Sequence, residues 1–412
     1  MDNACDVAVY DVIVVGGGVI GLSIISQLAE KEKGSYALYE KGLIGWGATY
    51  KSAALVRTHY TEEIAVRVAV RSLEFFKKKK VETGFNQVGF MVGVGSKDAD
   101  TLREVTRMMR NAGSNVRYSS NPSELESVDR FIDHKIYAAF AFEEEAGYAD
   151  PIKTVNYFRR TAEANGVEIF PRRSVDKLVV DGGSITGVKV DGDLVRADRV
   201  VIAAGAWSVD LARGVGDELP IRPRRSPVLL TRGPSGFGRD HPAFYDMVSG
   251  VYGRPYADDV LLAGPGLLAG AASATGQLKR VVNNMMKPQG GYKLTPDSYN
   301  GSLFPDEAEF IYQAVSKTFP ALKEGYPMFG WAGIIDDCSD GYEILGESLT
   351  TDGLFYAVGF SGHGFKEAPA VGEYICDKVL DRKPELDLSV YSLGRFKEGR
   401  PIVPGYTYLG GA

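Results

Sequence analysis

The chain has 412 residues, 44% of them hydrophobic and 24% charged, which is typical of a soluble globular protein with enough material for two domains or one large composite. Its net charge of −6 gives no basic surface for binding nucleic acid or an anionic membrane. Three widely spaced cysteines (Cys5, Cys338, Cys376) argue against a disulfide framework, and no two of the four histidines have metal-ligand spacing, so we expect no metal site.

Nothing in the sequence directs the chain to a membrane or out of the cell. The start MDNACDVAVYD lacks the charged and apolar regions of a secretory signal. No uninterrupted apolar run reaches membrane-spanning length. We therefore expect a cytoplasmic protein without an integral membrane segment.

The first strongly patterned segment, DVIVVGGGVIGLSIISQLAEKEKGSYALYEKG, predicts a strand, a helix and a second strand. Asp11–Val15 is the short apolar run of a parallel strand that is buried on both faces. Val19–Lys31 has helical periodicity, and Tyr36–Tyr39 is a second strand that ends at Glu40.

The loop between this strand and helix has the spacing Gly-x-Gly-x-x-Gly. Gly16 permits a tight turn, Gly18 lets the backbone approach a diphosphate, and Gly21 allows close packing of the helix on the strand. The helix N-terminus adds partial positive charge. Glu40 lies at the distance expected of an acid that binds an adenosine ribose, so the segment predicts a bound dinucleotide.

The next segments predict two helices and a series of hairpins. Amphipathic patterns predict helices from Glu62 to Lys80, where four lysines make a solvated end, and from Asp98 to Ala112. In LVVDGGSITGVKVDGDLVRADRVVIAAG, the turn residues Asp181–Gly183 and Asp191–Asp193 separate alternating strands.

The second half of the chain predicts an antiparallel sheet followed by a helix. Short apolar pieces such as SPVLLTR and DVLLAG are separated by Gly and Pro. PDEAEFIYQAVSKTFPAL opens with proline and acids and predicts a helix that ends before Pro320. The span 269–301 predicts no clear element, and we treat it as variable structure.

Two glycine-containing turns follow strands far from the first one, in VVIAAGAWS (200–208) and in GFSGHGFK (359–366). A nicotinamide-binding domain normally completes its sheet within about 150 residues, so these late strands favour a larger cofactor fold. Glycines cost stability in most places, and the cluster before the helical pattern EAPAVGEYICDKVL suggests that backbone approaches something closely there.

Together these segments resemble the D-amino-acid oxidase superfamily of FAD enzymes, closest to its sarcosine oxidase, dimethylglycine dehydrogenase and dye-linked proline dehydrogenase branch. The likeness rests on the first glycine loop with Glu40, on VVIAAGAWS, on GATYKSAALVRTHY, on GFSGHGFK and on the closing YSLGRF. It implies an α/β (α+β composite) fold in which a Rossmann-like FAD-binding domain, with the βαβ unit of glutathione reductase, is interleaved with an antiparallel-sheet substrate domain.

The resemblance also implies boundaries and cofactor contacts. The expected FAD-binding domain comprises residues 1–85, 145–222 and 330–384, the substrate-binding domain residues 86–144 and 223–329, and the C-terminal tail residues 385–412. The positions expected to contact FAD are Gly16, Gly18, Val19, Ile20, Gly21, Glu40, Lys41, Ser52, Ala53, Ala54, Val175, Ala204, Gly205, Trp207, Gly333, Gly359, Gly362, His363, Gly364, Phe365 and Lys366. Trp46 is expected to pack near the cofactor, and His59 is either a packed core histidine or an active-site group.

In the sarcosine oxidase branch, the lysine that ends GFSGHGFK and an arginine after the small-residue segment bind the substrate carboxylate. Lys366 and Arg57 match these positions, and structural salt bridges are the alternative for both. His363 is expected to contact flavin or backbone rather than to transfer protons. Tyr252 and Tyr256 are candidates to line the substrate cavity, with ordinary sheet packing as the equal alternative.

Two departures from the family pattern are informative. Monomeric sarcosine oxidases attach FAD through a cysteine, whereas this chain has Gly333 at that position and Cys338 several residues later, so we expect non-covalent FAD. Those oxidases also use a lysine in the substrate-domain sheet to activate oxygen, and DVLLAG has none. We therefore expect a dehydrogenase that reduces a quinone, a carrier flavoprotein or a dye.

The expected reaction is oxidation of a small amino acid with a secondary or tertiary amine (sarcosine, dimethylglycine, proline) by hydride transfer to flavin N5. Fold does not specify chemistry, so three alternatives remain. They are a 2-hydroxy-acid dehydrogenase of the 2-hydroxyglutarate type, a glycerol-3-phosphate dehydrogenase, and a flavin-bearing subunit of a hetero-oligomeric amino-acid dehydrogenase.

Overall fold

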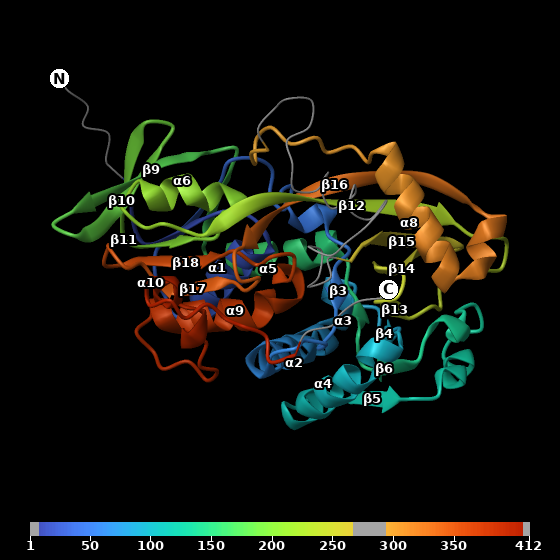
Figure 1. The fold of residues 1–412 in the computed structure, drawn as a ribbon. Coiled ribbons are helices and arrows are strands. Elements are labelled where there is room, and N and C mark those ends of the chain that lie inside the picture. Colours follow the sequence, from blue (N-terminus) through green and yellow to red (C-terminus); the bar gives the residue numbers. More distant parts are fainter. Residues whose placement is uncertain (1–7, 267–293, 407–412) are drawn as a thin grey trace, which may run out of the picture. The chain divides into compact units, whose positions relative to one another are not determined.

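The computed structural model describes residues 8–266 and 294–406 and contains two compact units, each made of separate stretches of chain (Figure 1). The first unit comprises Met1–Tyr50, Pro151–Pro223 and Ile335–Val403, and the second comprises Lys51–Asp150, Arg224–Ile334 and Pro404–Ala412. Residues 51–85, which we had assigned to the FAD-binding domain, thus cluster with the second unit. Cys5 and most of the span 269–301 lie outside the described residues.

The first unit is a mixed α/β layer structure. Its strands are β1 (Val9–Val15), β2 (Tyr36–Glu40), β8 (Glu168–Pro171), β9 (Val175–Asp181), β10 (Ser184–Val190), β11 (Asp193–Ile202), β17 (Ile344–Glu347) and β18 (Leu354–Val358). Its helices are α1 (Val19–Lys31), α5 (Pro151–Ala164), α6 (Ser208–Arg213), α9 (Gly364–Val379) and α10 (Gly394–Lys397). The strand order β17-β18-β11-β1-β2-β8 is parallel from β18 to β8.

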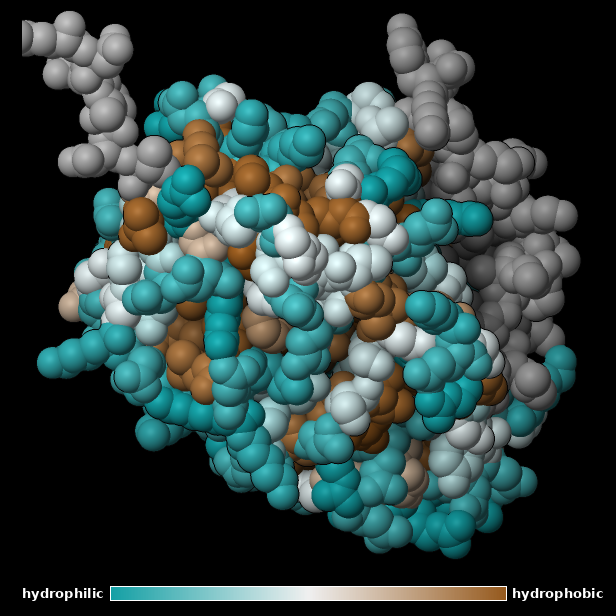
Figure 2. Space-filling model, turned by 90° about the vertical axis from the view of Figure 1, so that its left-hand side faces the viewer, coloured by the Kyte–Doolittle hydropathy of each residue, from teal (hydrophilic) through white to brown (hydrophobic). Residues whose placement is uncertain are grey.

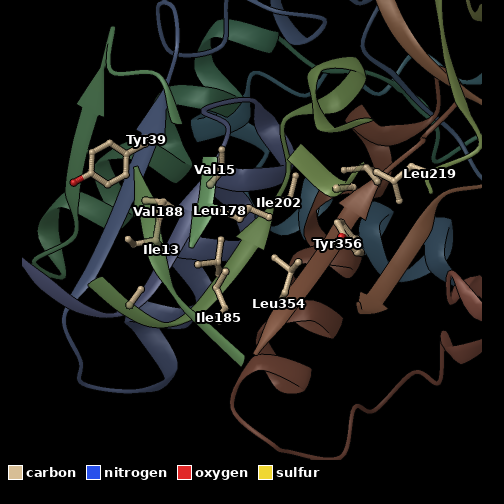
Figure 3. Close-up of a cluster of buried hydrophobic side chains, with 14 of the residues drawn as sticks. Ile13, Val15, Tyr39, Leu178, Ile185, Val188, Ile202, Leu219, Leu354 and Tyr356 are labelled. Atoms are coloured by element: carbon tan, nitrogen blue, oxygen red, sulfur yellow. The ribbon is translucent and has the colours of Figure 1, made fainter. Parts of the chain in front are cut away.

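Both faces of this parallel sheet are covered, as its continuous apolar strands require. Helix α1 lies on one face and packs against α5 and α9 (Figure 1). On the other face, Ile13 and Val15 of β1 join Leu178, Ile185 and Val188 of the β9–β10 hairpin in one buried cluster (Figure 3). The predicted hairpin turns are present, with Gly182, Gly183 and Gly192 at positive φ.

The second unit is built on a sheet of order β16-β12-β15-β14-β13-β4-β6-β5. Its strands are β4 (Phe90–Val94), β5 (Val116–Ser119), β6 (Ala139–Glu143), β12 (Ile221–Arg232), β13 (Ala243–Asp246), β14 (Val251–Ala257), β15 (Val260–Pro265) and β16 (Tyr326–Cys338), with a separate pair β3 (Leu55–Val56) and β7 (Gly147–Tyr148). The first three residues of β12 and the last four of β16, which include Asp336, belong to the first unit. Its helices are α2 (Glu63–Lys78), α3 (Lys80–Thr83), α4 (Ala99–Asn111) and α8 (Pro305–Thr318). β12 pairs with β15, β15 with β14, β14 with β13, β4 with β6 and β6 with β5 in antiparallel fashion, whereas β13 and β4 are parallel.

The two faces of this second sheet differ. One face packs under α8 in a core that includes Phe244, Leu261 and Phe319. At the edge of that core, Arg225 of β12 and Glu307 of α8 form an ion pair of 2.6 Å, with side chains 1% and 0% exposed. The other face packs against Ala53.

The described residues contain no helix that could span a membrane. On the face drawn in Figure 2, hydrophobic side chains lie in separate groups among hydrophilic ones. Within residues 8–266 and 294–406, no helix is long and apolar enough to cross a membrane.

Candidate functional site

Four loops leave the same edge of the first unit's sheet. Strands β1, β2, β11 and β18 are parallel, so their carboxyl ends meet at one edge. Glu40 is the last residue of β2, and the segments that follow β1, β11 and β18 contain Gly16–Gly21, Ala203–Trp207 and Gly359–Gly364. This is the edge at which open α/β sheets bind their ligands. The structure therefore brings the separate glycine motifs of the sequence together.

The first glycine loop has the backbone that a diphosphate site needs. Gly16 has φ +115°, and a Cβ on it would lie 2.4 Å from the Ala203 carbonyl oxygen. A Cβ on Gly21 would lie 2.0 Å from the carbonyl oxygen of Gly16, so only glycine fits. By contrast, the nearest atom to a Cβ on Gly18 is the Thr49 hydroxyl at 3.4 Å. Gly18 thus leaves room beside the first turn of α1, which contains no acidic residue.

Glu40 joins this loop to the end of β2. Its Oε2 accepts a hydrogen bond from Gly17 N at 2.7 Å, and its Oε1 accepts one from Gly42 N at 2.6 Å. Each carboxylate oxygen can accept a second bond, so both retain capacity for a ribose hydroxyl. Nearby, the Lys41 ammonium lies 6.0 Å from the ring centre of Trp207 in the loop after β11.

The backbone of the loop after β18 itself requires glycine at three positions. Gly359 and Gly362 have φ +77° and +93°, which strongly favour glycine. A Cβ on Gly364 would lie 2.9 Å from the ring of Phe360. We had explained these glycines by close approach to a flavin ring, and the structure adds an internal reason for each.

A buried carboxylate holds this loop in place. Asp336 of β16 accepts hydrogen bonds from Gly359 N at 2.6 Å and Phe360 N at 3.3 Å. Its main-chain carbonyl accepts another from Ser361 N. Burial raises the pKa of Asp336 to about 6, although the two backbone N–H donors act in the opposite direction. Sequence reasoning missed this residue.

Helix α9 begins in the same loop, with His363 as its N-cap residue. Lys366, in the first turn, is only 5% exposed, and its Nζ donates to the His363 carbonyl at 3.3 Å. The buried Glu343 has a pKa well above its usual range because of burial and the nearby Glu367, an effect that Arg395 and Lys366 oppose. Lys366 therefore lies in a buried region of mixed charge.

In the second unit, the guanidinium carbon of Arg57 lies over the rings of Tyr60 and Phe90, 4.9 and 5.5 Å from their centres. Its Nη1 donates to the His59 carbonyl. No carboxylate among the described residues forms an ion pair with Arg57. Burial and the charge of Arg57 lower the pKa of His59 to about 3, so His59 is neutral.

Two tyrosines lie beside each other on one face of the second sheet. Tyr245 and Tyr252 are directly paired across β13 and β14, and their nearly parallel rings are 6.5 Å apart. Their hydroxyls cover Gly266 and Gly264, where a Cβ would lie within 2.8 Å. Desolvation raises the pKa of Tyr245 to about 12, opposed by Arg57, and also raises the pKa of Tyr252. Both phenols are therefore protonated hydrogen-bond donors at neutral pH.

The family profile described as DAO, FAD dependent oxidoreductase, matches residues 11–378. The chain belongs to this family. FAD-dependent oxidoreductase domain-containing protein 1 of Xenopus laevis is 26% identical over 442 residues, covering 95% of this chain and 84% of that protein. Glycine oxidase of Geobacillus kaustophilus is 25% identical over 398 residues, covering 94% and 97%.

Solved structures show the same fold. The L-proline dehydrogenase of P. horikoshii has a TM-score of 0.84 to this chain at 23% identity, covering 96% of this chain and all of that one. The expected fold class and the resemblance to the D-amino-acid oxidase superfamily are thus confirmed. The cofactor of this FAD-dependent oxidoreductase is FAD.

The first unit fits FAD at its loop edge. The space beside Gly18 and the first turn of α1 suit the diphosphate, and Glu40 suits the ribose. Gly205, with φ +54°, has open space where a Cβ would be. Among the described residues, no group of three or more His, Cys, Asp or Glu side chains is placed to hold a metal ion.

The remaining residues predicted to contact FAD or line the site differ in their contacts and in their exposure to solvent. Ser52 Oγ accepts a hydrogen bond from Ala54 N, and Ala54 has φ +53°. Gly333 lies beside the side chain of Lys51: a Cβ added to Gly333 would lie 3.2 Å from the Lys51 Cβ. Val175 packs against the core of the first unit. Of the aromatic candidates, Trp46 and Tyr256 are 60% and 44% exposed.

Sequence reasoning did not single out Asp336, Tyr245 or the buried Glu143. Glu143 Oε2 accepts hydrogen bonds from both the N–H and the hydroxyl of Thr58, the residue after Arg57. Only Tyr245 had a usable signal, because AFYDMVSGVYGRPYA predicts two short strands with a tyrosine on each. Nothing local marks which acid of GIIDDCSD supports the glycine loop.

Proposed function

We propose that this chain is an FAD-dependent dehydrogenase of small amino acids with a secondary or tertiary amine, such as sarcosine, dimethylglycine or proline. Arg57 is the observation that carries the proposal. Its guanidinium contacts two aromatic rings, donates one N–H to a backbone carbonyl and forms no ion pair among the described residues, so it is suited to bind a substrate carboxylate. The name of the related glycine oxidase supports an amino acid as the substrate.

In this proposal, each residue of the site has a separate role in binding or orienting the substrate. Arg57 binds the carboxylate through its remaining N–H groups, and the neutral His59 adds no competing charge. Lys366 supplies a second positive charge for the same carboxylate. The phenols of Tyr245 and Tyr252 form a flat, protonated surface for the rest of the substrate. When bound, FAD supplies the hydride acceptor for oxidation of the carbon next to nitrogen.

The test is an anaerobic titration of the FAD-loaded protein with amino acids and hydroxy acids, followed at the visible flavin band at about 450 nm. Bleaching by sarcosine, dimethylglycine or proline is the expected result. In Arg57→Ala the substrate concentration for half-bleaching should rise about 100-fold, because a charge-assisted bidentate bond is lost. Arg67→Ala removes an exposed arginine that pairs with Glu63, and serves as the matched control.

Other outcomes would change the assignment. Bleaching by a 2-hydroxy acid alone would replace the substrate class and keep the carboxylate site. If half-bleaching needs the same substrate concentration in Arg57→Ala and Arg67→Ala, Arg57 does not bind the substrate carboxylate. Because only the neutral amine can lose hydride, the rate should rise with pH through the ionisation of the bound amine.

The proposed electron acceptor is a quinone, a carrier flavoprotein or a dye. Strand β15 contributes Leu261, Leu262 and Ala263 and carries no lysine, which supports slow reaction with oxygen. Oxygen uptake as fast as dye reduction at saturating amino acid would refute this part and make the protein an oxidase. The FAD is proposed to be non-covalent, since Cys338 is buried and burial raises its thiol pKa to about 12.

A further inference from the structure

One buried arginine of the second unit forms no ion pair among the described residues. Arg254 of β14 is 6% exposed, and no carboxylate among the described residues forms an ion pair with it. Burial lowers its pKa from the usual value, as expected of a desolvated cation. The nearby tyrosines and the charge of Asp150 oppose this shift. A buried cation that forms no ion pair is still costly, so its interactions need a reason other than general stability.

The guanidinium of Arg254 is held by two carbonyls and two rings. Its Nε donates to the carbonyl of Ala53 at 2.5 Å, and its Nη1 donates to that of Pro255 at 2.7 Å. Its carbon lies 4.5 Å from the ring centre of Tyr148 and 5.6 Å from that of Tyr256. A planar fork that stacks and donates at once is a task for arginine and not for lysine.

The backbone that Arg254 contacts, at Ala53, is four residues before Arg57. Ala54 has the left-handed φ of +53°, which is unfavourable for alanine and persists only where its surroundings fix it. The Ala54 carbonyl accepts from Ala149 N, and β3 pairs with β7, with Leu55 opposite Tyr148. Arg254 and Tyr148 therefore hold both sides of the same short segment.

We propose that Arg254 is a positioning residue that, with the Tyr148 ring, fixes residues 52–57 so that Arg57 can bind the substrate carboxylate. The proposal rests on the proposed carboxylate role of Arg57. Arg254 does not touch the substrate in this scheme. It acts through the Ala53 carbonyl and the backbone of the following four residues.

The test is a double-mutant cycle on the FAD-loaded protein, with calorimetric binding of 2-aminoisobutyrate as the readout. This probe has an amine and a carboxylate but no hydrogen on the carbon between them, so it binds without being oxidised. Arg254→Met should raise its Kd about 10-fold by displacing Arg57, with FAD content unchanged. Arg57→Ala should raise the Kd more, and Arg57→Ala with Arg254→Met should equal Arg57→Ala within about twofold.

Companion variants separate positioning from general damage. Tyr148→Phe keeps the ring and should bind like the wild type, whereas Tyr148→Leu and Arg254→Lys should weaken binding about three- to tenfold. If Arg254→Met does not fold, Tyr148→Leu and Arg254→Lys replace it in the double-mutant cycle. If the wild-type protein gives no heat with the probe, the KM of the oxidised substrate replaces the Kd, with kcat expected to change less than KM.

The outcomes are distinguishable. If the Kd of the double variant rises by the product of the two single-variant factors, Arg254 acts independently of Arg57 and the positioning role is overturned. An unchanged Kd in Arg254→Met would overturn it as well. An unchanged Kd in Arg57→Ala would instead refute the proposed function on which the inference depends.

Discussion

The carboxyl group of Asp336 makes a specific prediction about stability and pH. It is buried under the glycine-rich loop and accepts hydrogen bonds from Gly359 N and Phe360 N. Burial raises its pKa from 3.8 to about 6. Asp336→Asn keeps an oxygen acceptor of similar shape and removes the charge.

The size of the effect follows from that shift. A rise of about two pKa units corresponds to about 3 kcal/mol of preference for the protonated carboxyl in the folded state. Because the folded pKa is raised, this stabilisation is fully present below pH about 4 and is lost as the pH rises through about 6. At pH 8 the asparagine variant avoids that loss, and the raised pKa of Asp336 already includes the stronger N–H bonds that its charged form accepts. We therefore expect Asp336→Asn to equal or exceed the wild-type stability at pH 8.

The assay is unfolding of wild type and Asp336→Asn, each loaded with FAD, at pH 4.5 and pH 8. The difference in unfolding free energy between the two proteins should change by about 2–3 kcal/mol in favour of the variant as the pH rises. If all 412 residues melt together, this is a relative Tm change of about 3 °C. A variant that is destabilised by the same amount at both pH values would refute the reasoning and show that hydrogen bonding, not charge burial, dominates at Asp336.

Three further predictions concern other parts of the fold. Glu307→Ala leaves the guanidinium of Arg225 buried without its counterion, so chemical denaturation should show a loss of about 3–5 kcal/mol, and a loss below 1 would contradict the burial of that pair. Gly21→Ala places a methyl group against the Gly16 carbonyl and should abolish FAD retention, measured as the ratio of flavin to protein absorbance. Acid precipitation should release FAD into the supernatant, since the Cys338 thiol stays protonated, and a yellow pellet would disprove this.

Local patterns in the sequence were enough to predict the first βαβ unit. The helix Val19–Lys31 was predicted with the same bounds, because apolar periodicity and the glycine loop both mark its start. The strand after it extends one residue further, to Glu40. The helix at Pro305–Thr318 also ends as proline chemistry requires, before Pro320. These features depend on neighbours in the chain.

Features that depend on distant residues were not predictable in this way. The parallel pairing of β13 with β4 joins segments that are far apart in sequence and leaves no local mark. The Asp336 contacts with the glycine loop and the Arg254 contact with Ala53 are of the same kind. The burial of Lys366 was also unforeseen, because a charged residue at a helix entrance usually lies in water.

The place of β18 in the first unit's sheet bears on how the protein is made. β18 lies between β11 and β17, although the ribosome synthesises it long after β11. Until β18 has left the ribosome, the Val200–Ile202 part of β11 lacks its partner strand, and the loop Gly359–Gly364 does not exist. A nascent chain that stops before Leu354 therefore lacks part of the cofactor edge. Stable capture of FAD therefore requires that β18 and the loop after it have already been synthesised.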